Sequence, residues 1–247
     1  MLVSIIVPYF NDSEHINQSI NSALIQTYKK IEIIIIDDEN SENSKDTLNK
    51  IKKKSKKIKV FKTTKNKGVA FARNLGIYKS KGKFIAFLDS DDVWKKNKLL
   101  DQISIFKKKD IDICFTGYFG IKNNERIIYK VPPPSLINFE NLLKECPISC
   151  STILLKKKIL SNIKFKNLKT KEDYLLWLEL AQKNFKFFGI NKFLTLYRVR
   201  KNSLSSLHLN KLFSAFKIYS YYLNYNYLIA LVFVIRLYIN AFRKKFL

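Results

Sequence analysis

Lys83-Phe-Ile-Ala-Phe-Leu88, followed at once by Asp89-Ser90-Asp91-Asp92, is an apolar run that ends in a cluster of carboxylates. Such a run is typical of a strand buried on both faces of a sheet. Carboxylates at its end are costly to bury unless something cationic meets them. Mg²⁺ or Mn²⁺ is a natural partner, because hard cations take oxygen ligands and keep positions open for substrate phosphates. The alternative is that Asp91 or Asp92 caps a following helix.

Two earlier apolar runs have the same form. Residues 2–8 are β-branched and stop at a proline, and the polar stretch from Asn11 to Ser13 that follows could cap a helix. Residues 31–36 end at Asp37-Asp38. A carboxylate at such a strand end can accept a hydrogen bond from a base or ribose, although a turn or a helix cap would use the same residues.

Helical patterns separate these strands. Helices are expected where apolar residues recur from Ile16 to Leu24 and at 44–57, 69–80 and 99–108, with further strands at 59–63 and 112–118. This alternation predicts an α/β fold with an open, mostly parallel, Rossmann-like sheet and helices on both faces. Ligands bind such sheets at the carboxyl ends of the strands. We therefore expect the polar residues there to converge on one edge: Tyr9, Asn11, Asp37, Asp38, Asp89, Asp91 and Asp92.

The pattern becomes less regular further along. A glycine turn at 66–68 precedes a helix that carries Arg73, which could pair with a phosphate, orient a carboxylate or form a surface ion pair. After three prolines at 132–134, a strand is expected at 151–155 and a helix at 173–182. Glu172-Asp173 at the start of that helix could simply favour the helix dipole.

Positive charge concentrates toward the C-terminal end. The chain carries a formal net charge of +26, which attracts polyanions such as nucleic acid, an anionic membrane or a phosphate ligand, although an AT-rich coding bias toward lysine would give the same total. The last acid is Glu179, and residues 180–247 contain 12 Lys or Arg. This asymmetry is more informative than the total, because local charge decides which surface faces a charged partner.

Residues 208–247 are therefore expected to form a basic, amphipathic helical segment beside a domain at 1–207. Leu209, Leu212, Phe213, Phe216 and Tyr219 lie on one helical face. The apolar run at 227–235 is too short to span a membrane, which takes about 20 residues. The segment is predicted to lie on an anionic membrane surface with Arg243, Lys244 and Lys245 touching headgroups, or else to pack on its own domain or a partner.

The few cysteines and histidines indicate which cellular compartment and which kinds of metal site to expect. Three cysteines do not make a disulfide framework, and two histidines leave no plausible zinc site. The beginning of the chain has no basic, signal-like region. We expect a cytoplasmic protein, peripheral at the inner face of the membrane.

Six stretches, in this order, resemble the family 2 glycosyltransferases with the GT-A fold, over roughly residues 1–200. Each is weak alone, and the six in order are specific. They are Val3-Ser-Ile-Ile-Val-Pro-Tyr-Phe-Asn11, Gln26-Thr-Tyr28, Ile36-Asp-Asp-Glu-Asn-Ser41, Asn66-Lys-Gly-Val-Ala-Phe-Ala-Arg-Asn74, Phe87-Leu-Asp-Ser-Asp-Asp-Val-Trp94 and Lys171-Glu-Asp-Tyr-Leu-Leu-Trp177.

The resemblance implies roles for matching residues. Asp173 would be the catalytic base and Asp91 the direct ligand of a Mn²⁺ or Mg²⁺ ion, with Asp38 meeting a uracil-type base edge. The implied nucleotide- and donor-binding residues are Pro8, Tyr9, Asn11, Asp38, Lys67, Arg73, Asp89 and Ser90. Arg198 and Arg200, in a stretch like those of surface-polysaccharide enzymes, could contact phosphate or lie in a solvated loop.

The implied reaction is inverting transfer of one sugar from a nucleotide-diphosphate donor, a UDP-sugar, to an acceptor hydroxyl. The acceptor would be a saccharide or lipid-linked saccharide in bacterial surface polysaccharide, lipopolysaccharide or capsule assembly. Single-sugar addition is favoured because the Gln-x-x-Arg-Trp stretch of processive members is absent. One departure is Glu39, since the family usually has a glycine after the two aspartates.

Two other functions compete. A nucleotidyltransferase would normally have a Gly-rich, basic loop after the first strand, where this chain has Tyr9-Phe-Asn-Asp12. A nucleic-acid-binding protein would draw on the net charge, but charge alone gives only non-specific affinity and no recognition motif is present. We therefore expect no nucleic-acid partner.

Overall fold

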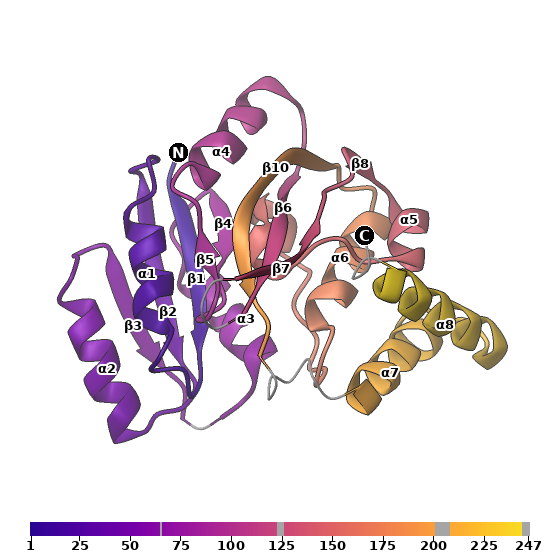
Figure 1. The fold of residues 1–247 in the computed structure, drawn as a ribbon, viewed down its shortest axis with the longest axis horizontal. Coiled ribbons are helices and arrows are strands. Elements are labelled where there is room, and N and C mark those ends of the chain that lie inside the picture. Colours follow the sequence, from indigo (N-terminus) through magenta and orange to yellow (C-terminus); the bar gives the residue numbers. More distant parts are fainter. Residues whose placement is uncertain (65, 123–125, 201–207, 244–247) are drawn as a thin grey trace.

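The computed structural model describes residues 1–64, 66–122, 126–200 and 208–243. Within them the strands form one 10-stranded sheet in the order β3-β2-β1-β4-β9-β6-β10-β5, with β7 beside β6 and β8 beside β10 (Figure 1). The strands are β1 (Val3–Tyr9), β2 (Ile31–Asp37), β3 (Ile58–Lys62), β4 (Phe84–Phe87), β5 (Val93–Trp94), β6 (Ile113–Ile121), β7 (Ile127–Val131), β8 (Leu136–Ile137), β9 (Leu154–Lys156) and β10 (Phe187–Arg198).

The helices cover both faces of this sheet (Figure 1). They are α1 (Ile16–Leu24), α2 (Glu42–Lys52), α3 (Val69–Lys79), α4 (Lys98–Lys108), α5 (Phe139–Lys144), α6 (Glu172–Gln182), α7 (His208–Lys217) and α8 (Tyr227–Arg243). Short 3₁₀ turns lie at Cys150–Thr152 and Lys157–Leu160, and a π-helical turn lies at Ile218–Tyr222. The α/β class that the sequence predicts is confirmed.

Parallel pairing is confined to two parts of the sheet. β3, β2, β1 and β4 are parallel neighbours, and β6 is parallel to β10. β9 enters between β4 and β6 and runs antiparallel to both. The sheet is therefore mixed, whereas the sequence predicts a mostly parallel one. The four parallel strands still bring the carboxyl ends of β1, β2 and β4 to one edge.

Alternating side chains of β1 reach two separate parts of the core. Ile5 packs with Ile16 and Ile20 of α1 on one face, whereas Ile6 belongs to the core that includes Trp177 of α6. α3 lies very close to β1, since a Cβ at Gly76 would stand 2.3 Å from Cγ2 of Ile6. A glycine at this position lets the helix that carries Arg73 approach the sheet.

Several element boundaries differ from those predicted. α2 ends at Lys52, well before residue 57, and begins at the cap residue Ser41, whose hydroxyl accepts from the backbone N–H of Ser44 at 3.0 Å. The stretch from Asn11 to Ser13 does not cap α1, which begins after His15 without a side-chain cap. A 3₁₀ turn takes up the first part of the predicted 151–155 strand, and β9 begins at Leu154.

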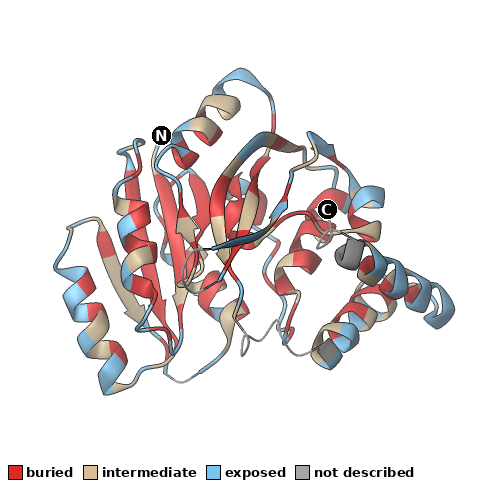
Figure 2. Cartoon of the chain, viewed as in Figure 1, coloured by how far each residue is buried: buried red, intermediate tan, exposed pale blue. Residues whose placement is uncertain are grey.

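The C-terminal helices complete the core. Ala215, Ile218, Tyr219, Ala230, Val234 and Leu237 are buried in the same cluster as α6. Figure 2 shows buried positions where α7 and α8 meet the rest of the protein and exposed positions on their outer side. The predicted apolar face of α7 is only partly buried, because Leu209 and Phe213 are exposed. None of the described helices is long and apolar enough to cross a bilayer.

Candidate active site

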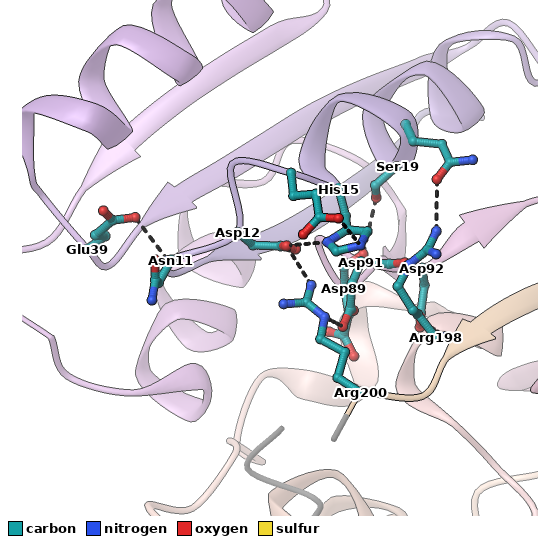
Figure 3. Close-up of polar contacts among 12 residues, drawn as sticks. Asn11, Asp12, His15, Ser19, Glu39, Asp89, Asp91, Asp92, Arg198 and Arg200 are labelled. Carbon is teal, nitrogen blue, oxygen red and sulfur yellow. Dashed lines mark hydrogen bonds and ion pairs between the residues drawn. The ribbon is translucent and has the colours of Figure 1, made fainter. Parts of the chain in front are cut away.

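Polar side chains from the ends of β1, β4 and β10 come together at one edge of the sheet (Figure 3). The backbone N–H of Asp38 donates to the carbonyl of Tyr9 at 2.9 Å, which joins the ends of β2 and β1. The Ser19 hydroxyl donates to the carbonyl of Asp89 at 3.1 Å, which joins α1 to the loop after β4. The predicted convergence of these strand ends is therefore observed.

Arg73 connects two carboxylates from opposite sides of the site. Its guanidinium lies 2.7 Å from Oδ1 of Asp89 and 2.5 Å from Oε1 of Glu172, and only 3% of the residue is exposed. This burial excludes the predicted alternative that Arg73 forms a surface ion pair. The two contacts agree instead with the alternative that Arg73 orients carboxylates. Sequence reasoning missed Glu172 as a partner, although its place beside Asp173 was a usable signal.

Asp173 follows Glu172 in the first turn of α6. Its Oδ1 accepts from the backbone N–H of Tyr174 at 2.7 Å in the first turn of α6. Burial raises the pKa of Asp173, and the nearby Arg73 lowers it in part. A carboxylate with a raised pKa is a better proton acceptor near neutral pH, as a general base requires.

Arg200 bridges two other carboxylates. Its guanidinium lies 2.5 Å from Oδ1 of Asp12 and 2.9 Å from Oδ2 of Asp91 (Figure 3). Burial raises the pKa of Asp91 to about 6, with Arg200 opposing the rise and Asp89 and Asp12 adding to it. The sequence places Asp12 in a stretch that could cap a helix, whereas in the structure its Oδ1 lies 2.9 Å from Nδ1 of His15 and it takes part in the site.

Arg198 fixes the loop that carries Asp91. Its backbone N–H donates to Oδ1 of the fully buried Asp92 at 3.0 Å, and its Nε donates to the carbonyl of Asp91 at 3.0 Å. A third bond runs to Oε1 of Gln18 at 2.8 Å. Arg198 is thus a buried support rather than part of a solvated loop. Neither Asp91 nor Asp92 caps a helix, because α4 starts only at Lys98 after Asn97.

Asp38 organises the loop between β3 and α3. Its carboxylate accepts from the Thr63 hydroxyl at 2.7 Å, from the backbone N–H of Lys67 at 3.0 Å and from that of Gly68 at 2.8 Å. Gly68 has a φ of +87°, which favours glycine. These bonds place Lys67 beside an open pocket of about 460 Å³, which is lined by Asn66, Lys67, Ala70, Phe71, Asn74, Phe165 and Asn167.

Glu39, the residue that departs from the family pattern, joins the ends of β1 and β2. Its carboxylate accepts from the backbone N–H of Asn11 at 2.9 Å and from the Ser41 hydroxyl at 2.5 Å. Asn11 has a positive φ of 47°, so this bond stabilises a sharp turn after β1. Of the other predicted residues, Tyr9 is buried, whereas Pro8 and Ser90 are partly exposed.

The predicted residues therefore form three groups rather than one pocket. Arg73 joins Asp89 to the start of α6, Arg200 joins Asp91 to Asp12, and Asp38 holds the loop with Lys67. Sequence reasoning recognised the strand ends but could not pair these groups. The arginine partners come from distant segments, so their pairing depends on the packing of α3 and β10.

The donor chemistry of the second group suits a hard divalent cation. Such ions are commonly bound through one or two carboxylates together with substrate phosphates. Asp12 and Asp91 offer two carboxylates, and Oδ2 of Asp12 is buried without a hydrogen-bond partner within the described residues. Those residues hold no cluster of three or more His, Cys, Asp or Glu that could enclose a metal. An open site completed by phosphate oxygens is the form that fits.

Comparison with known proteins identifies the fold and the class of chemistry. The profile described as Glycosyl transferase family 2 matches residues 4–164. The Escherichia coli protein WfaP, a UDP-Glc:alpha-D-GlcNAc-diphosphoundecaprenol beta-1,3-glucosyltransferase, is 39% identical over 205 residues, covering 83% of this chain and 80% of WfaP.

Two solved structures share the fold. Staphylococcus aureus TarS 1-349 in complex with UDP-GlcNAc superposes with a TM-score of 0.72 at 23% identity, over 88% of this chain and 65% of that one. This chain thus spans about two thirds of the TarS fragment. The mannosyltransferase PcManGT from Pyrobaculum calidifontis, in complex with GDP-Man and Mn²⁺, gives 0.71 at 13% identity, over 94% and 69%.

Proposed function

This chain belongs to glycosyl transferase family 2, and on that premise we propose that it transfers one sugar, with inversion, from a UDP-sugar to the hydroxyl of a lipid-linked saccharide. The observation that carries the proposal is the Arg73 bridge. It holds Asp89, at the end of a central strand, beside Glu172 at the start of the helix that bears Asp173. A donor-side acid and a candidate base are thereby fixed across one site. This assignment replaces the nucleotidyltransferase alternative, and the absence of a nucleic-acid partner stays a prediction.

Asp173 is the group proposed to move the proton. Its carboxylate would take the proton of the acceptor hydroxyl as that oxygen attacks the anomeric carbon opposite the leaving diphosphate. Attack from the opposite face inverts the anomeric centre. Arg73 contributes by holding the start of α6 through Glu172, which fixes where Asp173 stands.

Asp91, together with Asp12, is proposed to hold the Mn²⁺ or Mg²⁺ ion. A divalent cation bound there would offset the negative charge that develops on the departing diphosphate. The fully buried Asp92 and Arg198 position Asp91 without meeting the ion. The complex of PcManGT with Mn²⁺ supports this choice of ion only as a precedent within the fold.

The donor is proposed to be a UDP-sugar. Support comes from WfaP, whose name gives UDP-Glc, and from the TarS structure, which is a complex with UDP-GlcNAc. Asp38 is proposed to lie at the base, with Pro8, Tyr9 and Asn11 forming the same pocket and Lys67 and Ser90 reaching the donor. Because the Asp38 carboxylate already accepts hydrogen bonds from three donors, we expect it to act as much by shaping the loop before α3 as by touching uracil.

The acceptor is proposed to be reached at an anionic membrane surface. α7 and α8 are anchored in the core on one side and expose large apolar side chains on the other, including Leu209, Phe213, Tyr227, Leu228, Leu231, Val232, Ile235 and Ile239. No acid follows Glu179, so the charged residues in the sequences of α7 and α8 are all Lys or Arg. Apolar insertion together with cationic contacts is how interfacial helices bind anionic lipid. Of the predicted headgroup contacts, Lys244 and Lys245 lie outside the described residues.

Nucleoside diphosphate release across a panel of nucleotide sugars tests the reaction. Transfer by the wild type with Mn²⁺ should fall at least about 100-fold in Asp173→Asn, the loss typical of a missing general base. Asp91→Ala and EDTA should abolish it. Asp110→Asn serves as the control, because it changes an exposed aspartate that pairs with Lys186 and not with the residues of the candidate site. Full activity in Asp173→Asn would remove Asp173 from the mechanism.

A further inference from the structure

Arg200 occupies the position between Asp12 and Asp91 that a bound cation would compete for. Asp12 follows β1, Asp91 follows β4 and Arg200 follows β10, so three separate segments meet at one guanidinium (Figure 3). The Asp12 side chain is only 2% exposed, and that of Asp91 is 23% exposed. The arrangement is therefore partly enclosed rather than an incidental surface pair.

The surroundings explain why a cation is needed there. Asp89 and Asp92 belong to the same short loop as Asp91, and Glu14 lies close to His15. Carboxylates gathered at a protein edge repel one another unless a positive charge lies between them. Arg73 and Arg198 are already engaged with Asp89, Glu172 and the loop itself. Arg200 is the guanidinium that meets Asp12 and Asp91 together.

We infer that Arg200 is an internal counter-ion that competes with the divalent metal for Asp12 and Asp91. This inference rests on the proposed function, because it takes the metal of the sugar donor as the competitor. Oδ2 of Asp91 lies 2.9 Å from Nε of Arg200, and Oδ1 of Asp12 lies 2.5 Å from the terminal nitrogen. A metal ion that binds these same oxygens must displace the guanidinium from them, since two cations cannot share them closely.

If Arg200 competes with the metal, its loss should change the affinity for the metal in the opposite direction from the loss of a residue that only holds Asp91 in place. Arginine stays protonated at all accessible pH values, so its charge opposes a second cation under every working condition. A residue that merely held Asp91 in place would strengthen metal binding, and its loss would weaken it. A competitor has the opposite sign: its removal frees two carboxylates for the metal. The sign of one measured change therefore decides between the two roles.

The experiment is titration of Mn²⁺ into the nucleotide-free protein, followed by calorimetry and by the Mn²⁺ electron paramagnetic resonance signal. Arg200→Gln should bind Mn²⁺ about tenfold more tightly than the wild type, the scale of one partly buried ion pair removed. Arg200→Lys keeps the charge but loses the planar guanidinium that contacts both carboxylates, so it should bind Mn²⁺ with intermediate affinity. Lys192→Gln removes a cation that pairs with Asp101 at the surface and controls for net charge.

A second variant tests the assigned oxygens. Adding Asp12→Asn to Arg200→Gln should weaken Mn²⁺ binding again, and far-UV circular dichroism checks that each variant is folded. Equal or weaker binding by Arg200→Gln, or no Mn²⁺ binding by any variant, would overturn the competition. Sugar transfer by the wild type is measured separately. If Arg200→Gln does not bind Mn²⁺ more tightly while transfer persists, only the competition is lost. If transfer is absent, the proposed function is lost, and with it the identification of the competing metal as that of the sugar donor.

Discussion

The hydroxyl groups of Tyr174 and Tyr219 lie 2.7 Å apart in the protein interior and join the helix that carries Asp173 to the C-terminal segment. The Tyr174 hydroxyl also lies 2.6 Å from the carbonyl oxygen of Leu142, and that of Tyr219 lies 2.8 Å from the carbonyl oxygen of Leu143. Because each hydroxyl carries one proton, one of them donates to its carbonyl while the other donates to the neighbouring hydroxyl. Both tyrosines are buried. The segment after residue 207 is therefore part of the structure that supports α6 and is not an independent appendage.

Removing residues 208–247 should therefore unfold the protein or leave it aggregated. The truncation would expose the apolar surface of α5 and α6 and leave the Tyr174 hydroxyl without one partner. The milder Tyr219→Phe should lower the free energy of unfolding by about 1–2 kcal/mol, the cost of losing a buried hydrogen bond. Urea unfolding measures both changes, with the exposed Tyr221→Phe as control. A cooperative transition of unchanged midpoint in residues 1–207 would show that the two parts fold independently.

Lys98 should make stability depend on pH above neutrality. The residue is fully buried, its Nζ donates to Oε1 of Gln102 at 2.9 Å, and burial lowers its pKa from 10.5 to about 7. Between these values the unfolded chain binds a proton that the folded chain does not, so the free energy of unfolding rises with pH. Below pH 7 both states are protonated, and the folded protein carries the full cost of the buried charge.

Lys98→Met should accordingly be more stable than the wild type near pH 6, by a few kcal/mol and at most about 5. The advantage should shrink as the pH rises toward 10, because the wild type then loses its buried charge. Thermal unfolding across pH 6–10 measures the difference, and Lys96→Met provides the same substitution at a neighbouring exposed lysine. A difference between the two proteins that did not change with pH would show that Lys98 is not buried in its charged form.

Replacing Arg73 alone should lower the free energy of unfolding more than replacing Arg73 and Glu172 together. Arg73→Met leaves Glu172 buried without its cation, which typically costs about 3–5 kcal/mol of stability. The double change Arg73→Met with Glu172→Gln removes the buried carboxylate too and should recover part of that loss. Chemical denaturation of the wild type, both single variants and the double variant gives the coupling free energy. Additive losses would mean that the two residues do not stabilise each other.

The sequence predicts much of the fold because the buried strands are visible as continuous apolar runs. Residues 31–36 read as a strand and form one that is buried throughout. The polar residues at strand ends were found for the same reason, since parallel strands bring their ends together. What the sequence could not supply was long-range pairing. Arg73 meets Glu172 across 99 residues, and the insertion of β9 between β4 and β6 depends on packing that no local pattern records.

The exposed apolar face of α8 should decide binding to lipid. Leu228 and Val232 lie one turn apart and are 79% and 63% exposed. Replacing both with aspartate should lower the affinity for phosphatidylglycerol vesicles at least about tenfold, because burying each side chain contributes about 1.5–3 kcal/mol when complete and the new charges repel the lipid. Leu100→Asp on α4, well away from α7 and α8 in Figure 1, provides the control. Vesicle sedimentation gives the affinities, and wild-type binding should weaken with salt. Undiminished sedimentation of the double variant would exclude this face, and a change from dimer to monomer in light scattering would assign it to a second copy of the chain.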